Sequence, residues 1–290
     1  MFRRRRGAHL RLLAVLLPMA VLVAACGGDD DDSAASGDGG GGDEAADTAE
    51  TTAPPAETLH ILVTDDDGVE GAGMDALVEA LAAVPDTEVT VVAPATDQSG
   101  TGDTTSPAPP AATETTLPSG YAAIAVAGFP ADAVQHALSE VFTADEPPDL
   151  VVSGINAGQN LGPVAAQVSG TVGAALTAAR AGVPAFAVSQ GIGEAFDYAT
   201  GVDLALDWIE EHRQALLDGD VGTDAVANLN VPSCADGEIK GVVEVPTATD
   251  AADRNVLAAV DCTVAAPATD PADDIDAFAL GYAPLADVPL

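Results

Sequence analysis

Hydrophobic residues along this chain follow two periodicities, that of buried strands and that of amphipathic helices. Residues 59–73 begin as an apolar, β-branched run of strand length and then turn abruptly polar at three consecutive aspartates. Behind them, apolar side chains recur at helical spacing from Met74 to Val84. The same alternation continues to about residue 231. It predicts strands at 88–93, 121–126, 149–153, 184–189 and 226–231, and helices at 130–142, 165–181 and 196–217.

Strands that alternate with helices in this way predict an α/β fold. We expect a Rossmann-like, mostly parallel sheet with helices on both faces. Residues 95–120 are rich in Thr, Pro, Ser and Gly and predict a long loop, which in a compact domain is usually functional or mobile. After Cys234 the pattern breaks into short β-prone pieces, so a small, irregular, β-rich C-terminal part is expected.

The first 56 residues predict export. Four arginines from Arg3 onward precede an apolar run, 12–23, that is short for a membrane span, and small residues lead to Cys26. Val-Ala-Ala-Cys resembles the lipobox of bacterial lipoproteins, which implies cleavage before Cys26 and lipid attachment to its sulfur. A plain signal peptide that happens to contain a cysteine is the alternative.

The segment 27–56 consists mostly of Gly, Asp, Ala, Ser and Thr and has no apolar periodicity. Such a segment buries too little surface to fold, so it predicts a disordered acidic linker. The expected plan is therefore a lipoprotein signal peptide at 1–26, this linker at 27–56, and a folded domain at 57–290.

The charge of the chain limits its partners. The formal net charge is −37, and five of the nine Lys and Arg residues precede Cys26 whereas all 46 Asp and Glu residues follow it. A nucleic-acid polymer needs a basic face, so this class of partner is excluded. An anionic substrate would have to be attracted by a bound cation and by backbone amides.

Two cysteines remain after Cys26. In an exported protein the pair Cys234 and Cys262 predicts a disulfide, and two free buried thiols are the alternative. Metal ligation by this pair is disfavoured, because the sequence has no CxxC motif or histidine beside them.

Polar residues follow three of the predicted strands, and the carboxyl ends of parallel strands meet at one edge of a sheet. Carboxylate, hydroxyl and amide oxygens together suit a hard cation, and a helix N-terminus offers N–H groups to a phosphate. A solvated acidic turn is the simpler alternative. The residues concerned are Asp65, Asp66 and Asp67 after the first strand, Ser99 after the second, Asn156 and Asn160 after the third, and Ser169, Gly170 and Thr171 opening a helix.

In this order the motifs resemble those of the SurE survival-protein family of metal-dependent 5′/3′-nucleotidases, which are also acid phosphatases. The matching elements are DDG, APxxxQSG, SGINxGxNLG, SGTVxxA, AGVPAxAVS and NxNxP, from His60 to about Pro232. The resemblance implies hydrolysis of phosphomonoesters, chiefly nucleoside 5′- or 3′-monophosphates, with Mg²⁺ or Mn²⁺. It implies that Asp66 and Asp67 are catalytic and bind the metal with Ser99 and Asn156, and that Asn160, Ser169, Gly170 and Thr171 surround the phosphate.

The chain departs from the family pattern at three places. Asp65 stands where the family usually has asparagine. Residues 101–110 keep little of the family's Ser-rich substrate-facing loop, which leaves the substrate open. The family's usual final helix is missing, so a homodimer through exchanged C-terminal segments is left open as well.

Two other functions stay open at this point. Asp65, Asp67 and Gly68 also fit the DxDG motif of haloacid-dehalogenase-type phosphatases, in which Asp65 would be the nucleophile. That mechanism needs a downstream lysine to stabilise the phosphoaspartate, and here it would have to be Lys240 in the divergent tail. The other is a lipoprotein that binds a nucleotide or a metal without turnover. The favoured expectation is a 5′-nucleotidase-type hydrolase anchored by its lipid to the outer face of the cytoplasmic membrane or the cell envelope.

Overall fold

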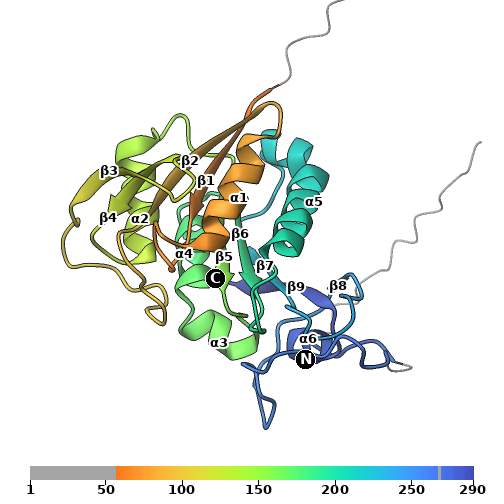
Figure 1. Cartoon of the computed structure of the whole chain (residues 1–290). Coiled ribbons are helices and arrows are strands. Elements are labelled where there is room, and N and C mark those ends of the chain that lie inside the picture. Colours follow the sequence, from red (N-terminus) through yellow and green to blue (C-terminus); the bar gives the residue numbers. More distant parts are fainter. Residues whose placement is uncertain (1–56, 267–268) are drawn as a thin grey trace, which may run out of the picture. The chain divides into compact units, whose positions relative to one another are not determined.

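The computed structural model describes residues 57–266 and 269–290. The expected signal peptide with Cys26, and the expected linker, lie outside this range. The described residues form a nine-stranded sheet in the order β3-β4-β2-β1-β5-β6-β7-β9-β8 (Figure 1). Its strands are β1 (Leu59–Thr64), β2 (Thr87–Pro94), β3 (Ala112–Thr116), β4 (Ala122–Val126), β5 (Leu150–Ala157), β6 (Ala185–Gln190), β7 (Ala225–Val231), β8 (Val242–Glu244) and β9 (Ala283–Pro289).

The sheet is mostly parallel, which confirms the predicted α/β fold. Strands β4, β2, β1, β5, β6 and β7 pair in parallel, whereas β3 and β9 pair antiparallel to β4 and β7. The chain first adds β2 and β4 on one side of β1 and later adds β5, β6 and β7 on the other. The strand order therefore reverses between β1 and β5, and open α/β sheets place their ligands at the carboxyl ends of such a pair.

Helices cover both faces of the sheet, and each face has its own core. Helices α1 (Ala72–Ala82) and α5 (Tyr198–Leu217) pack against the face that carries Ile61 and Val63, whereas α2 (Pro130–His136) and α4 (Gly170–Arg180) cover the face of Leu62 (Figure 1). Strands buried on both faces read as continuous apolar runs, which is why β1 and β5 were visible in the sequence.

A stack of rings joins α5 to the sheet. The Trp208 ring lies 4.2 Å from the Phe186 ring of β6, centroid to centroid, and 4.2 Å from the ring of His212 on its other side. Such pairs stabilise a core by about 0.5–1.5 kcal/mol beyond the area that they bury.

Several predicted elements were wrong in detail. The predicted loop 95–120 contains β3, a largely exposed edge strand rich in Thr, which lacks an apolar period but gains its hydrogen bonds from β4. The predicted helix 165–181 is two helices, α3 (Gly162–Gln167) and α4, because Ser169 has an extended backbone and caps α4. The helix predicted at 130–142 ends as a π-helical turn, η1 (Ala137–Val141).

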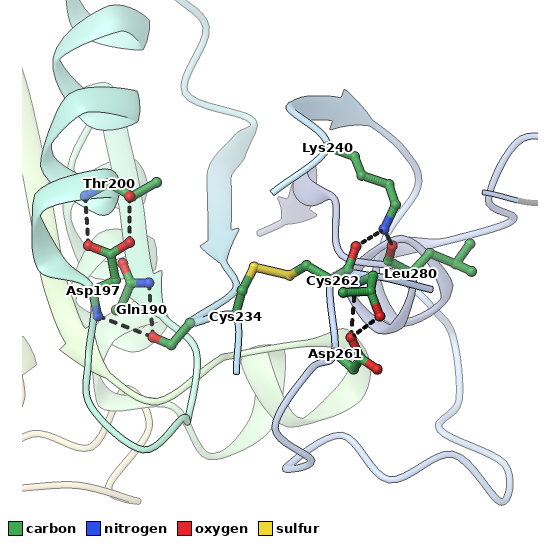
Figure 2. The surroundings of a disulfide bond; sticks show 10 residues. Gln190, Asp197, Thr200, Cys234, Lys240, Asp261, Cys262 and Leu280 are labelled. Carbon is green, nitrogen blue, oxygen red and sulfur yellow. Dashed lines mark hydrogen bonds between the residues drawn. A yellow bond between two sulfur atoms is a disulfide. The ribbon is translucent and has the colours of Figure 1, made fainter. Parts of the chain in front are cut away.

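The C-terminal part is more ordered than its sequence pattern indicated. Strand β9 joins the main sheet beside β7, and α6 (Asp274–Ala279) precedes it. A disulfide links Cys234 to Cys262 (Figure 2). Around Cys262 lies a third small core, which includes Ile275 and Phe278 together with Leu161 from the loop after β5. Within the described ranges, none of the helices has the length and apolar character needed to cross a membrane.

Candidate active site

The three aspartates lie in a rigid turn at the carboxyl end of β1. Asp65 is fully buried and Asp66 is 3% exposed, whereas Asp67 is half-buried. Gly68 closes the turn with a φ of +80°, and a Cβ there would lie 2.8 Å from the carbonyl oxygen of Pro94 at the end of β2. The turn therefore requires glycine and is packed directly against the neighbouring strand end.

Asp66 is oriented by the start of α4. Thr171 Oγ1 donates a hydrogen bond of 2.6 Å to Asp66 Oδ1. Gly170 packs so closely that a Cβ on it would lie 2.6 Å from the Cβ of Asp66. Burial raises the pKa of Asp66, and the hydrogen bond from Thr171 opposes that rise.

Asp67 reaches across to β5. Its Oδ2 accepts a hydrogen bond of 2.9 Å from the backbone N–H of Ala157. Burial raises the pKa of Asp67, and the charges of Asp66 and Asp97 add to the rise, although the bond from Ala157 lowers it. The two predicted metal-binding aspartates are thus brought together with the end of β5, as the strand topology requires.

Asp65 differs from both. Neither of its carboxyl oxygens has a hydrogen-bond partner among the described residues. Burial, followed by the charges of Asp66 and Asp67, raises the pKa of Asp65 well above its usual value. A nucleophile must reach the phosphorus atom, so a side chain with no exposed surface does not fit the dehalogenase-type role. Lys240 does not fit either, because its amine donates to the carbonyl oxygens of Cys262 and Leu280 (Figure 2).

The predicted neutral ligands lie at the next two strand ends. The loop after β2 is tied to the aspartates by a 2.8 Å hydrogen bond from the N–H of Gln98 to the carbonyl of Asp66. In that loop Ser99 is exposed, and its Oγ donates to Asp97. Asn156, at the end of β5, donates from Nδ2 to the carbonyl of Gly158 at 2.6 Å, which leaves its amide oxygen as an acceptor.

These donors fit a hard divalent cation. Two carboxylates, a hydroxyl and an amide oxygen are the ligand types of Mg²⁺ and Mn²⁺, and a cation would relieve the repulsion within the aspartate turn. In the part of the chain that the structure describes, no three His, Cys, Asp or Glu side chains are grouped to hold a metal. Such a cation would therefore depend on Asp66, Asp67 and the neutral oxygens of Ser99 and Asn156.

The predicted phosphate side is formed by α4 and the loop after β5. Ser169 caps α4, because its Oγ accepts from the N–H of Val172 at 3.0 Å. The N–H groups of Gly170 and Thr171 precede the first bond within the helix, so they are available to an anion. Asn160 has a positioning contact there: its Nδ2 donates to Thr171 Oγ1 at 3.2 Å and to Ser189 Oγ at 2.9 Å. Asn160 thus holds Thr171, which in turn holds Asp66.

Sequence reasoning assigned no role to three residues around Asn160. Ser189, Asn228 and Asn230 are fully buried or nearly so. Asn230 Oδ1 accepts from the N–H of Asn160 at 2.6 Å, and Asn228 Nδ2 donates to its carbonyl at 2.9 Å. The signal was present, since asparagines two apart on a buried strand point to the same face and must find polar partners there.

A separate groove lies away from this site. Its volume is about 1090 Å³, and it runs between α5 and the strands β7 and β9. Ala185 and Ala225, the first residues of β6 and β7, line it. It therefore extends to the amino ends of the parallel strands, opposite the edge where the aspartates lie.

Comparison with known proteins agrees with this geometry. A family model described as Survival protein SurE matches residues 61–270. A protein of Methanopyrus kandleri named 5′-nucleotidase SurE is 45% identical over 194 residues, which are 63% of this chain and 71% of that protein. One of the same name from Rhizorhabdus wittichii is 36% identical over 193 residues, 65% of this chain and 72% of that protein.

The fold matches as well. The crystal structure of the SurE protein from Aquifex aeolicus superposes with a TM-score of 0.63 at 27% identity, covering 79% of this chain and 93% of that one. The family model spans both the aspartate turn and the asparagines of β7. On the sequence match and the shared fold, this chain belongs to the SurE survival-protein family.

Proposed function

We propose that this protein is a metal-dependent phosphomonoesterase that hydrolyses nucleoside 5′- or 3′-monophosphates to nucleoside and phosphate. The family and the shared name of its curated relatives, 5′-nucleotidase SurE, support a phosphoric monoester hydrolase. The observation that carries the proposal is the contact between Asp66 and Thr171, which joins an acidic turn to an anion-binding helix start within one hydrogen bond.

The chain's own residues divide into two groups around the substrate. Asp66, Asp67, Ser99 and Asn156 would hold Mg²⁺ or Mn²⁺, which supplies Lewis-acid stabilisation of charge on the phosphoryl group. Gly170 and Thr171 offer backbone N–H groups and the positive end of the α4 dipole to the phosphoryl oxygens.

Positioning of these groups is built into the fold. Thr171 Oγ1 accepts from Asn160 and donates to Asp66, so the phosphate-binding helix and the acidic turn keep one relative orientation. Asp67 is fixed by the N–H of Ala157. Groups held in advance in this way do not have to reorganise as charge develops in the transition state.

We further propose that the enzyme works outside the cytoplasmic membrane as a lipoprotein. The supporting observations are the lipobox-like sequence ending at Cys26 and the acidic segment 27–56 that follows it. A disulfide between Cys234 and Cys262 is consistent with an oxidising compartment. The partners would then be a nucleotide substrate and the membrane. A homodimer remains a prediction.

The test is phosphate release by the full chain, purified in detergent, from nucleoside monophosphates and p-nitrophenyl phosphate. The assay is run with EDTA, Mg²⁺ or Mn²⁺. We expect metal-dependent turnover that Asp66→Asn and Asp67→Asn abolish and that Asp65→Asn retains. Loss of activity in Asp65→Asn alone would instead support the dehalogenase-type mechanism. Nucleotide binding without turnover on any substrate would leave a binding lipoprotein.

A further inference from the structure

Gln159 connects the loop after β5 to two other parts of the chain. The residue is 3% exposed, and its amide group is fully used. Its Oε1 accepts from the N–H of Ile192, in the loop after β6, at 2.8 Å. Its Nε2 donates to the carbonyl oxygens of Val256 and Ala258 at 2.9 and 3.1 Å. A buried amide with both donors and its acceptor engaged is a rigid cross-link.

The next residue carries this cross-link to the site. Asn160 is held through its backbone by Asn228 and Asn230. Its side chain then contacts Thr171, and Thr171 contacts Asp66. Gln159 therefore anchors the backbone next to Asn160, and the side chain of Asn160 orients Asp66 through Thr171.

Two of the three partners of Gln159 lie inside a loop that the disulfide closes. Val256 and Ala258 fall between Cys234 and Cys262, which are 28 residues apart. This closed segment, residues 234–262, has few regular elements of its own, with β8 as its strand. The disulfide thus joins Cys262, at the end of this segment, to Cys234, which follows shortly after β7 (Figure 2).

A buried carboxylate ties the same two regions together. Asp274, at the start of α6, accepts from the N–H of Gly162 at 2.7 Å and from the N–H of Ala248 at 2.8 Å. Gly162 begins α3 directly after the loop that carries Gln159 and Asn160, and Ala248 belongs to the closed segment. Two independent contacts therefore attach this loop to the region around residues 234–262.

We propose that Gln159 is a positioning residue through which the disulfide-closed segment fixes Asn160 and Thr171 beside Asp66, so that turnover depends on the oxidised Cys234–Cys262 pair. This rests on the proposed hydrolase function. Gln159 stands at a position that the SurE pattern SGINxGxNLG leaves open, so this connection belongs to this chain rather than to the motif.

The test is a double-mutant cycle on the full chain. Gln159→Leu removes the three hydrogen bonds at similar volume, and Cys234→Ser with Cys262→Ser opens the closed segment. Gln214→Leu is the control, because it removes an exposed amide on α5 that bonds Asp218. kcat and KM for a nucleoside monophosphate are measured well below the lowest melting temperature of the set, together with hydrogen exchange of residues 157–162.

We expect Gln159→Leu and the cysteine pair each to lower kcat about ten- to a hundredfold with little change in KM, because both displace groups that act in the transition state. The combined variant should lose little more than either alone, since both cut the same connection. Hydrogen exchange at Asn160 should quicken in each, and the control should match the wild type.

The proposed coupling between Gln159 and the disulfide is wrong if the losses of kcat multiply in the combined variant. It is also wrong if Gln159→Leu keeps the wild-type kcat. A rise in KM alone would assign Gln159 to substrate binding and also contradict it. If the wild-type chain hydrolyses no phosphomonoester, the proposed function fails, and the exchange measurement then decides the coupling by itself.

Discussion

Asp65→Asn changes a single atom at the most buried carboxyl group of the site. In the wild-type chain this carboxyl group has no exposed surface and, among the described residues, no hydrogen-bond donor. The charges of Asp66 and Asp67 disfavour its ionised form. An asparagine there has the same shape, carries no charge and can donate to the neighbouring carboxylates. We therefore expect the variant to be more stable than the wild type at neutral pH.

The sign and size of the effect follow from the raised pKa of Asp65. The folded state keeps its proton at pH values where the unfolded chain, with a pKa near 3.8, has lost it. The free energy of unfolding of the wild type therefore falls by about 1.4 kcal/mol per pH unit as the pH rises from the unfolded pKa to the folded one. The variant lacks this loss, because its amide does not titrate in either state.

The assay is urea unfolding of wild type and variant in EDTA at several pH values from 4 to 8. Other titrating groups contribute to both proteins, so they largely cancel in the difference between the two free energies of unfolding. Asp203→Asn is the control, because it removes one exposed charge from a chain of net charge −37 and so measures the general relief of repulsion.

The expected result is a stability difference that grows in favour of Asp65→Asn from pH 4 upward and exceeds that of the control. A difference that does not vary with pH would show that Asp65 titrates alike in both states and would refute the reasoning. So would a variant less stable than the wild type at pH 7.

Three further predictions concern the same architecture. Thr171→Val removes the donor to Asp66 and the acceptor for Asn160, so kcat should fall at least about tenfold while the circular dichroism spectrum stays unchanged. Burial raises the pKa values of Asp66 and Asp67, and a metal needs both carboxyl groups deprotonated. The affinity for Mn²⁺, measured by calorimetry, should therefore fall as the pH decreases, and the fall should begin above the usual carboxyl range. An affinity that does not vary with pH would contradict this. Reducing the Cys234–Cys262 disulfide should lower the free energy of unfolding by about 3.5 kcal/mol, from the closure of a loop of 28 residues, and a melting temperature insensitive to reductant would contradict it.

The fold and the chemistry of the strand ends were predictable from the sequence because they follow local rules. Buried parallel strands are apolar throughout, and the residues that follow them meet at one edge whatever the details of packing. That is why the amino-acid pattern alone was enough to group Asp66, Asp67 and Asn156. The contact of Asp67 with Ala157 follows directly from the pairing of β1 with β5, whereas the contact of Asp66 with Thr171 also needs α4 and Asn160.

The parts that escaped prediction depend on partners distant in sequence. Strand β3 has no apolar period of its own and exists because β4 is beside it. The role of Asn160 depends on Asn228 and Asn230, about 70 residues away, and the C-terminal elements depend on the main sheet and on a disulfide. Neither periodicity nor motif spacing contains this information.

The ring stack on α5 has a practical consequence for studying this protein. Trp208 is the single tryptophan of the whole chain, so excitation near 295 nm reports on one place, the contact of α5 with β6. Its emission should therefore follow the separation of that helix from the sheet. Because Trp208 also lines the groove with Val242 and Glu244, a loosening of residues 234–262 should change its emission as well, before the far-ultraviolet signal of the helices is lost. Emission and far-ultraviolet circular dichroism recorded during one melt would then tell whether the domain unfolds in a single step or releases its C-terminal part first.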